Sequence, residues 1–160
     1  MELTLPDEAA TAAWGAALAR ALPDLAHRTL LLGLSGDLGS GKTTLARGLL
    51  RALGVAGTIR SPTYTLVEPY ETPAGTVHHL DLYRVSGGGP ELEALGFREL
   101  CALPGLVMVE WPERAGDAIG STDVQAALAI IGSGRRVTLE ARSEPGREWL
   151  ARASGFALSS

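Results

Sequence analysis

A glycine-rich loop between a buried strand pattern and a helical pattern constrains the fold more than any other feature of the chain. The loop has the spacing Gly-x-x-x-x-Gly-Lys-Thr and covers residues 36–43. It follows a continuous apolar run at 29–34 and precedes a helical pattern at 42–53, which Gly54 ends. Glycines let successive backbone N–H groups point inward, and the helix adds the positive end of its dipole. The sequence therefore predicts strand, loop and helix around a phosphate-binding cradle.

The only lysine of the chain lies in this loop. The chain has 14 lysine and arginine residues, and all except Lys42 are arginine. An ammonium is a compact point charge that fits between the β- and γ-phosphates of a nucleotide, whereas the planar guanidinium is wider. Lys42 is therefore expected to act in catalysis, and the Thr43 hydroxyl to bind a Mg²⁺ ion that bridges phosphate oxygens. The residues expected to bind the nucleotide here are Asp37, Leu38, Gly39, Ser40, Gly41, Lys42 and Thr43.

The remaining patterns predict one α/β domain of the P-loop NTPase type over residues 1–160, with a mixed central sheet flanked by helices. A second buried strand at 106–109 ends at Glu110, and the tail from about 154 to 160 is expected to fray. The other predicted elements are a helix at 7–22, a hairpin at 65–71 and 76–83, short helical pieces at 91–103, a hairpin at 124–131 and 135–142, and a helix at 144–153.

Two acidic residues are candidates for the protein side of a magnesium site. Glu110 ends a buried strand, which suits the carboxyl edge of a parallel sheet where ligands of open α/β folds bind. Asp81 lies on a predicted strand whose alternation places it on one face with His79 and Tyr83. The pattern does not rank the two acids, so both are candidate metal ligands and catalytic residues. The alternative makes either one a surface charge or an ion-pair partner of Arg84 or Arg114. His78 and His79 point to opposite faces, and a packing role is favoured for them over chemistry.

Two further features each leave two interpretations open. The segment Ser-Pro-Thr at 61–63 follows the loop helix, where many P-loop proteins place a segment that senses the γ-phosphate. It is equally compatible with a plain turn into a strand. Trp111 directly follows Glu110 and either walls the pocket or packs in the core.

Charge and composition limit the classes of partner that the chain can bind and the compartment in which it is expected. A net charge of −4 and a pI near 5.4 give no broad basic field, so direct, tight binding of RNA or DNA is not expected. The single cysteine, Cys101, fits a reducing compartment. No N-terminal signal is visible, and the longest apolar run is too short to cross a bilayer. We therefore expect a cytoplasmic protein with no membrane partner.

Four ordered motifs resemble those of the TsaE family, the bacterial ATPases required for the threonylcarbamoyladenosine modification of tRNA. The motifs are Gly-Asp-Leu-Gly-Ser-Gly-Lys-Thr-Thr at 36–44, Ser-Pro-Thr-Tyr at 61–64, His-x-Asp-x-Tyr-Arg at 79–84 and Val-Glu-Trp-Pro-Glu-Arg at 109–114. The resemblance runs from the first predicted helix to about residue 142. Four motifs in this order are far more specific than a phosphate loop alone.

The resemblance implies roles for individual residues. The loop, with Thr44 included, would bind ATP or ADP with Mg²⁺, and the segment 61–63 would act as a switch. Thr43 and Glu110 would contact the metal, and Asp81 would support hydrolysis. The resemblance also places Trp111 by the nucleotide and Thr11 beside the adenine.

The resemblance further implies two protein partners, TsaB and TsaD. TsaD transfers the threonylcarbamoyl group to adenosine 37 of tRNA, so this chain would meet tRNA only indirectly. No arginine lies in the loop or in the segment 61–70 to neutralise transition-state charge, so Arg84 or a partner must supply that charge. ATP hydrolysis by the chain alone is therefore expected to be slow and to be stimulated by the partners.

Two other P-loop classes are alternatives. A small-molecule kinase shares the phosphate cradle but also needs an arginine-bearing lid. Here Arg84, Arg98 and Arg114 are scattered, and the flexible stretch 87–89 has no basic residue. A regulatory GTPase reads guanine with an Asn-Lys-x-Asp segment, and this chain has no asparagine and no second lysine. The kinase therefore remains the main alternative.

Overall fold

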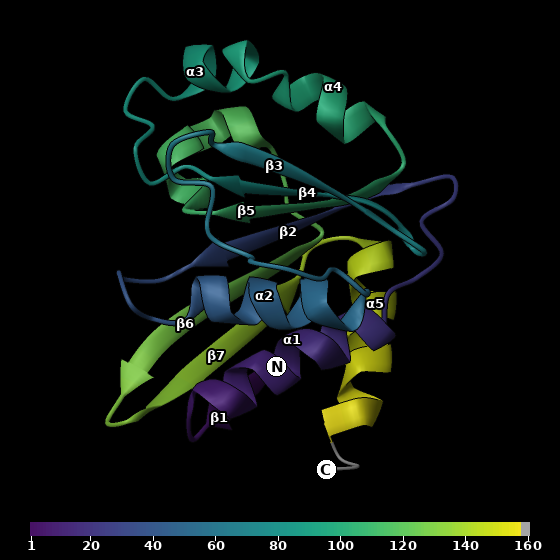
Figure 1. Ribbon diagram of the computed structural model, residues 1–160, viewed down its shortest axis with the longest axis vertical. Helices are drawn as coiled ribbons and strands as arrows, with labels where there is room; N and C mark the ends of the chain where they lie inside the picture. The colour runs from purple at the N-terminus through teal and green to yellow at the C-terminus, as the bar shows by residue number, and fades with distance from the viewer. Residues whose placement is uncertain (158–160) are drawn as a thin grey trace.

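Seven strands form one mixed sheet with helices on both of its faces (Figure 1). The structure is a computed structural model that describes residues 1–157. The strands are β1 (Glu2–Leu5), β2 (Thr29–Ser35), β3 (Val67–Thr72), β4 (Gly75–Asp81), β5 (Gly105–Glu110), β6 (Val124–Ile131) and β7 (Gly134–Ala141). The helices are α1 (Glu8–Arg20), α2 (Lys42–Ala52), α3 (Gly89–Ala94), α4 (Phe97–Ala102), the 3₁₀ helix η1 (Pro112–Ile119) and α5 (Glu144–Ala157).

The strand order is β1-β7-β6-β2-β5-β4-β3, and the four central strands, β6, β2, β5 and β4, run parallel. In the register of the parallel strands, Glu110 of β5 lies opposite both Leu34 of β2 and Asp81 of β4. The carboxyl ends of these strands therefore meet at one edge of the sheet. The loop that leaves β2 and the two candidate acids are brought together there.

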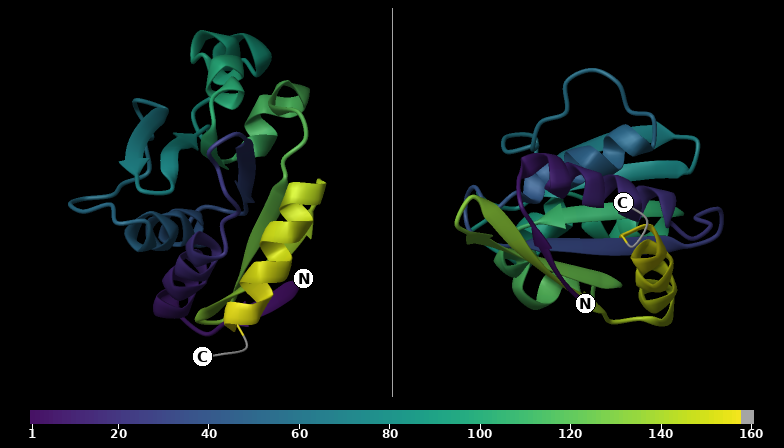
Figure 2. Two further views of the ribbon diagram at one scale, coloured as in Figure 1. Left: turned by 90° about the vertical axis from the view of Figure 1, so that its right-hand side faces the viewer. Right: turned by 90° about the horizontal axis from the view of Figure 1, so that it is seen from below.

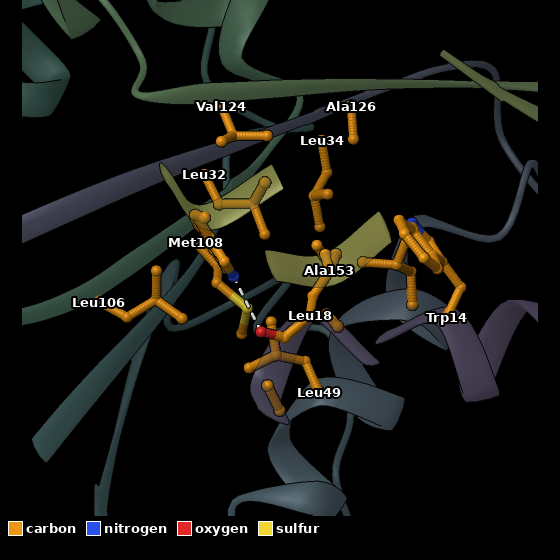
Figure 3. Packing of buried hydrophobic residues seen from close by; sticks show 14 of the residues in the cluster. Trp14, Leu18, Leu32, Leu34, Leu49, Leu106, Met108, Val124, Ala126 and Ala153 are labelled. Atoms are coloured by element: carbon orange, nitrogen blue, oxygen red, sulfur yellow. Dashed lines mark hydrogen bonds between the residues drawn. The ribbon is translucent and has the colours of Figure 1, made fainter. Parts of the chain in front are cut away.

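Alternation along β2 separates two hydrophobic cores. Leu30, Leu32 and Leu34 point into a cluster with α1, α2 and α5, whereas Leu31 points into a cluster with α3, α4 and η1. In the first cluster, the indole nitrogen of Trp149 donates to the Leu18 carbonyl oxygen over 2.8 Å (Figure 3). Figure 2 shows α1 and α2 side by side, with α3 and α4 at the far end of the molecule. The predicted mixed sheet flanked by helices is confirmed.

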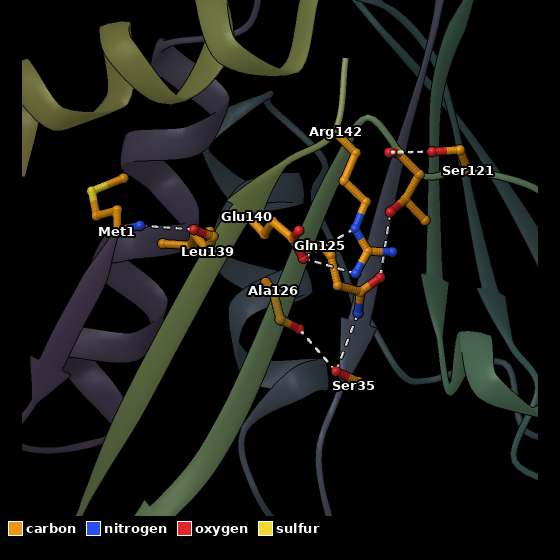
Figure 4. Close-up of polar contacts among 9 residues, drawn as sticks. Met1, Ser35, Ser121, Gln125, Ala126, Leu139, Glu140 and Arg142 are labelled. Carbon is orange, nitrogen blue, oxygen red and sulfur yellow. Dashed lines mark hydrogen bonds and ion pairs between the residues drawn. The ribbon is translucent and has the colours of Figure 1, made fainter.

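Polar contacts tie the antiparallel side of the sheet to the end of β2 (Figure 4). The Gln125 side chain of β6 donates to the Ser35 hydroxyl over 3.1 Å, one residue before the phosphate loop begins. The N-terminal ammonium of Met1 donates to the Leu139 carbonyl oxygen of β7 over 2.8 Å. The first contact holds the start of the loop against β6, and the second joins the N-terminus to β7.

The structure differs from the sequence-based expectation at the chain ends. Strand β1 was not predicted, because it is a four-residue edge strand whose partner β7 lies far along the chain. Helix α5 continues to Ala157, beyond the expected end at 153, so residues 154–157 of the tail that was expected to fray are helical in the structure. Residues 158–160 of that tail lie outside the described residues. No helix among the described residues is long and apolar enough to cross a membrane.

Helices α1 and α2 touch at glycines, and this contact makes a testable prediction. A Cβ atom on Gly15 would lie 2.1 Å from the Leu45 carbonyl oxygen and 2.9 Å from the Leu49 backbone nitrogen. Both atoms belong to the backbone of α2 and cannot rotate away. Gly15→Ala is therefore expected to lower the free energy of unfolding by about 1–3 kcal/mol, measured by urea unfolding.

Gly155→Ala is the matched control, because Gly155 is also helical and a Cβ atom there would meet no atom of residues 1–157 within 4 Å. Alanine has the higher helix propensity, so this variant is expected to be neutral or more stable by up to about 1 kcal/mol. Equal unfolding energies for the wild type and Gly15→Ala would refute the close α1–α2 contact.

Candidate functional site

The loop between β2 and α2 has a backbone that requires glycine. Gly36, Gly39 and Gly41 have φ angles of 138°, 79° and 103°, a region that side chains rarely adopt. A Cβ atom on Gly36 would also lie 2.2 Å from the Leu128 carbonyl oxygen of β6. Helix α2 begins at Lys42 with no side-chain cap, so the N–H groups of its first turn remain available to an anion.

The Lys42 ammonium lies inside the curve of the loop. Its Nζ donates to the carbonyl oxygens of Gly36 over 2.6 Å and Asp37 over 2.9 Å, and it sits 4.1 Å from the centre of the Trp111 ring. Burial lowers the pKa of Lys42, although the negative charge of Glu110 and other nearby acids opposes that shift. The arrangement holds one positive charge at the mouth of the loop, against an aromatic wall.

Thr43 and Glu110 meet across the sheet edge. The Thr43 hydroxyl lies 3.1 Å from each carboxylate oxygen of Glu110, a side chain that is only 2% exposed. Oxygen donors of this kind suit Mg²⁺, which keeps few protein ligands and takes its others from phosphate and water. No three His, Cys, Asp or Glu side chains among residues 1–157 gather as a metal site of their own. The donor set therefore fits a magnesium ion that arrives with a phosphate.

Asp81 is held differently. The Ser61 hydroxyl donates to its Oδ2, and the backbone N–H of Tyr83 donates to its Oδ1 over 2.9 Å. Its own backbone N–H donates to the carbonyl oxygen of Leu66, whose φ of 64° is unusual for a branched side chain. Both ends of the segment 61–66 are thus hydrogen-bonded to Asp81, one of the two candidate acids.

The phosphate loop, Thr43, Glu110 and Asp81 line one cavity of about 440 Å³. Ten of the twelve site residues expected from the sequence line it: Thr11, Leu38, Gly39, Gly41, Lys42, Thr43, Thr44, Asp81, Glu110 and Trp111. The other two, Asp37 and Ser40, do not line it, but the Asp37 carbonyl oxygen and the Ser40 hydroxyl accept from Lys42. The expected residues therefore converge on one place.

Two residues of the site were not expected from the sequence. Arg135 of β7 lines the cavity and donates from Nη2 to the Gly39 carbonyl oxygen over 3.1 Å. Its position follows from the β6–β7 hairpin, which carried no chemical signal. A packing role was favoured for His79 over a chemical one, but its Nε2 lies 2.8 Å from Glu110 Oε1. The alternation that places His79 and Asp81 on one face was the signal for this contact.

The fold and the loop define the class of the chain, a P-loop α/β protein with two acids at the neighbouring strand ends. The family model described as threonylcarbamoyl adenosine biosynthesis protein TsaE matches residues 5–138. The TsaE protein of Haemophilus influenzae is 34% identical over 144 residues, which cover 89% of this chain and 90% of that protein. The TsaE protein of Synechocystis is 46% identical over 118 residues, 71% of each chain. The chain belongs to the TsaE family.

A solved structure shows the same fold. The crystal structure of Bacillus subtilis YdiB superposes with a TM-score of 0.77 and 22% sequence identity, and the match covers 98% of this chain and 95% of that one. The mixed sheet and its flanking helices are thus shared with a protein whose sequence has diverged widely.

Proposed function

We propose that the chain binds ATP with Mg²⁺ in this cavity, hydrolyses it, and serves the threonylcarbamoyl modification of adenosine 37 in tRNA together with TsaB and TsaD. One observation carries the proposal. Lys42 and Thr43 of the loop meet Glu110, 67 positions after Thr43, in a single cavity. Membership of a family named for threonylcarbamoyl adenosine biosynthesis supports the pathway.

Each group has a task in this proposal. The N–H groups of the loop and the Lys42 ammonium bind the phosphates, and Thr43 and Glu110 hold the metal. Mg²⁺, when bound, neutralises phosphate charge and orients the γ-phosphate. Asp81 supports the attack of water, and the products are ADP and phosphate. Glu110 is the nearer magnesium ligand of the two acids, because it contacts Thr43 whereas Asp81 is occupied by Ser61 and Tyr83.

The cavity on the opposite side of the sheet is not placed to hold the acceptor of a kinase. This second cavity of about 480 Å³ is lined by Thr29, Leu31, Phe97 and Cys101. It therefore lies at the start of β2, and Leu31 faces the cluster on the opposite side of the sheet from α2. A molecule bound there is remote from the phosphate loop, which follows the end of β2. This separation argues against a kinase acceptor site in that cavity.

Arg84, the arginine that the sequence suggested as a source of transition-state charge, lies outside the nucleotide cavity, and this favours help from a partner. Arg84 stacks its guanidinium 4.5 Å above the centre of the Tyr64 ring, and Tyr64 is 84% exposed. Neither residue lines the nucleotide cavity. We infer that hydrolysis is slow until TsaB and TsaD bind, and that the acidic chain reaches tRNA through these proteins in the cytoplasm.

A nucleotide panel tests the proposal. Binding of ATP, ADP and GTP is measured by calorimetry with Mg²⁺ and with chelator, and the fate of labelled γ-phosphate is followed with and without candidate nucleoside and sugar acceptors. We expect binding of ATP and ADP that Mg²⁺ strengthens, weak GTP binding, and free phosphate as the only labelled product. Transfer of the label to an acceptor would put the kinase alternative first.

Arg135 gives a separate prediction for nucleotide binding. Its guanidinium adds a second positive charge beside the loop, and a Cβ atom on Gly41 would lie 3.7 Å from its Nε. Arg135→Ala is expected to weaken ATP and ADP binding by about threefold to tenfold, the effect of losing one partly exposed charged contact. The affinity is measured by calorimetry. Arg135→Lys should recover only part of the loss, because lysine lacks the planar fork.

The neighbouring arginine is the matched control. Arg136 points to the other face of β7 and pairs with Glu2 over 3.6 Å. Arg136→Ala removes the same charge from the chain and should leave nucleotide affinity unchanged. Equal losses in the Arg135→Ala and Arg136→Ala variants would mean that only the net charge matters.

A further inference from the structure

His79 is a fully buried histidine with one hydrogen-bond partner. It is 0% exposed on β4, and its Nε2 lies 2.8 Å from Oε1 of Glu110. The other ring nitrogen, Nδ1, is buried and has no partner among residues 1–157. A carboxylate only accepts hydrogen bonds, so Nε2 carries the proton and donates to Glu110.

The pairing of β4 with β5 explains why the two side chains meet. His79 lies opposite Met108, and Asp81 lies opposite Glu110, so all four side chains share the sheet face that carries α2. His79 is therefore the diagonal neighbour of Glu110 within that face. The ring approaches the carboxylate from inside the protein, and the Thr43 hydroxyl approaches it from α2.

A purely packing role does not account for a histidine at this position. An apolar side chain would fill the same buried space without leaving Nδ1 unpaired, and buried polar atoms normally have partners. Among residues 1–157, the contact with Glu110 is the one hydrogen bond of the ring. The hydrogen bond to the Glu110 carboxylate is thus the feature that explains an imidazole at this position.

We propose that His79 is a positioning residue, which fixes the Glu110 carboxylate beside Thr43 so that it can hold a divalent cation. The inference rests on the proposed magnesium–nucleotide site and deepens it. The hydrogen bond from Nε2 occupies Oε1 and restricts rotation of the carboxylate, so Oε2 and the Thr43 hydroxyl stay together. Partners of metal-binding carboxylates usually change metal affinity by about tenfold to a hundredfold when they are removed.

The experiment measures the affinity of a fluorescent ADP analogue across a Mg²⁺ titration. It yields two quantities. One is the affinity for the analogue in chelator, and the other is the Mg²⁺ midpoint, the Mg²⁺ concentration at which half of the metal-dependent increase in affinity is reached. His79→Leu is expected to raise that concentration by about tenfold to a hundredfold and to change the affinity in chelator by less than about twofold. His78→Gln is the control, because His78 points to the opposite face, and it should match the wild type in both quantities.

Two amide variants keep the test decisive if His79→Leu does not fold. The glutamine amide of His79→Gln can place an N–H near the position of Nε2, whereas the shorter amide of His79→Asn cannot reach Glu110. Glutamine should therefore restore the Mg²⁺ response and asparagine should not. In a Glu110→Gln background, His79→Asn should have no further effect on the Mg²⁺ response, because a positioning residue acts only through the group it positions.

Three results would overturn the inference alone, in a wild type that responds normally to Mg²⁺. The first is a normal Mg²⁺ midpoint in both His79→Leu and His79→Asn. The second is a loss of nucleotide affinity in these variants that is as large in chelator as it is with Mg²⁺. The third is an effect of His79→Asn on the Mg²⁺ midpoint that is as large in the Glu110→Gln background as in the wild type. A wild type that binds the nucleotide analogue without any Mg²⁺ response would instead refute the proposed metal site, and with it this role of His79.

Discussion

Replacing Lys42 with alanine is expected to weaken the binding of ATP and ADP by about tenfold to a hundredfold or more. The variant loses a charge-assisted contact to phosphate, an interaction of about 1.5–3 kcal/mol. Lys42 lies inside the curve of the loop, where its Nζ lies 2.6 Å from the Gly36 carbonyl oxygen. Calorimetric titration with Mg²⁺–ADP measures the affinity, and phosphate release measures the loss of hydrolysis.

Lys42→Arg should also be impaired, although it keeps the charge. Lys42 is 5% exposed and its ammonium lies 4.1 Å from the Trp111 ring centre, so we expect the wider guanidinium to fit poorly in the loop. Arg47→Ala is the control, because Arg47 lies on the same helix and pairs with Glu8 over 3.8 Å. Wild-type affinity in both Lys42 variants would remove the phosphate-loop assignment.

Glu110→Gln is expected to raise the Mg²⁺ concentration required for ATP hydrolysis by about tenfold or more and to lower the maximal rate. The amide keeps the shape of the side chain but removes the negative charge that faces Thr43 at 3.1 Å. Glu110→Ala should have at least the same effect, and it also leaves His79 without its partner. Phosphate release across a magnesium titration, with thermal unfolding as a check of folding, gives both quantities.

Asp81→Asn provides the comparison for Glu110. It should lower the maximal rate but change the Mg²⁺ midpoint less, because Asp81 is bonded to Ser61 and Tyr83 rather than to Thr43. Midpoints that shift equally in the Asp81 and Glu110 variants would show that both acids hold the metal. Unchanged titrations in both would leave the pair as buried structural charges.

The local part of the site is predictable from the sequence. The strand, loop and helix around Lys42 follow one another in the chain, so apolar periodicity and glycine spacing suffice to place them. The same holds for the strand that ends at Glu110, because a buried parallel strand appears as an unbroken apolar run. These elements and both predicted hairpins are present in the structure.

The remaining contacts depend on how distant segments pair, and sequence patterns do not contain that information. Whether Ser61 meets Asp81, or His79 meets Glu110, depends on the register between strands. Arg135 reaches Gly39 only because β7 folds back along β6 beside the loop. The sequence also left Asp81 and Glu110 unranked, and the contact of Thr43 with Glu110, on which the proposed ranking rests, is visible only in the structure.

The contact between Ser61 and Asp81 suggests how a partner could sense the nucleotide. A ligand shifts a conformation only if it binds its two forms unequally. The segment 61–66 is fastened to an acid at the cavity wall, and Tyr64 beside it is exposed. If the γ-phosphate of ATP contacts this segment, the ATP-bound protein would present a different surface to a partner than the ADP-bound protein does.

Steady-state ATP hydrolysis with increasing amounts of the TsaB–TsaD complex tests the central claim most directly. Binding to the complex is measured alongside it in ADP, in a non-hydrolysable ATP analogue and without nucleotide. We predict a low rate for the chain alone, a saturable increase with the complex, and binding that differs between the two nucleotides. A rate that stays unchanged at saturating complex, together with binding that ignores the nucleotide, would contradict the proposed role of the chain as a partner-coupled ATPase.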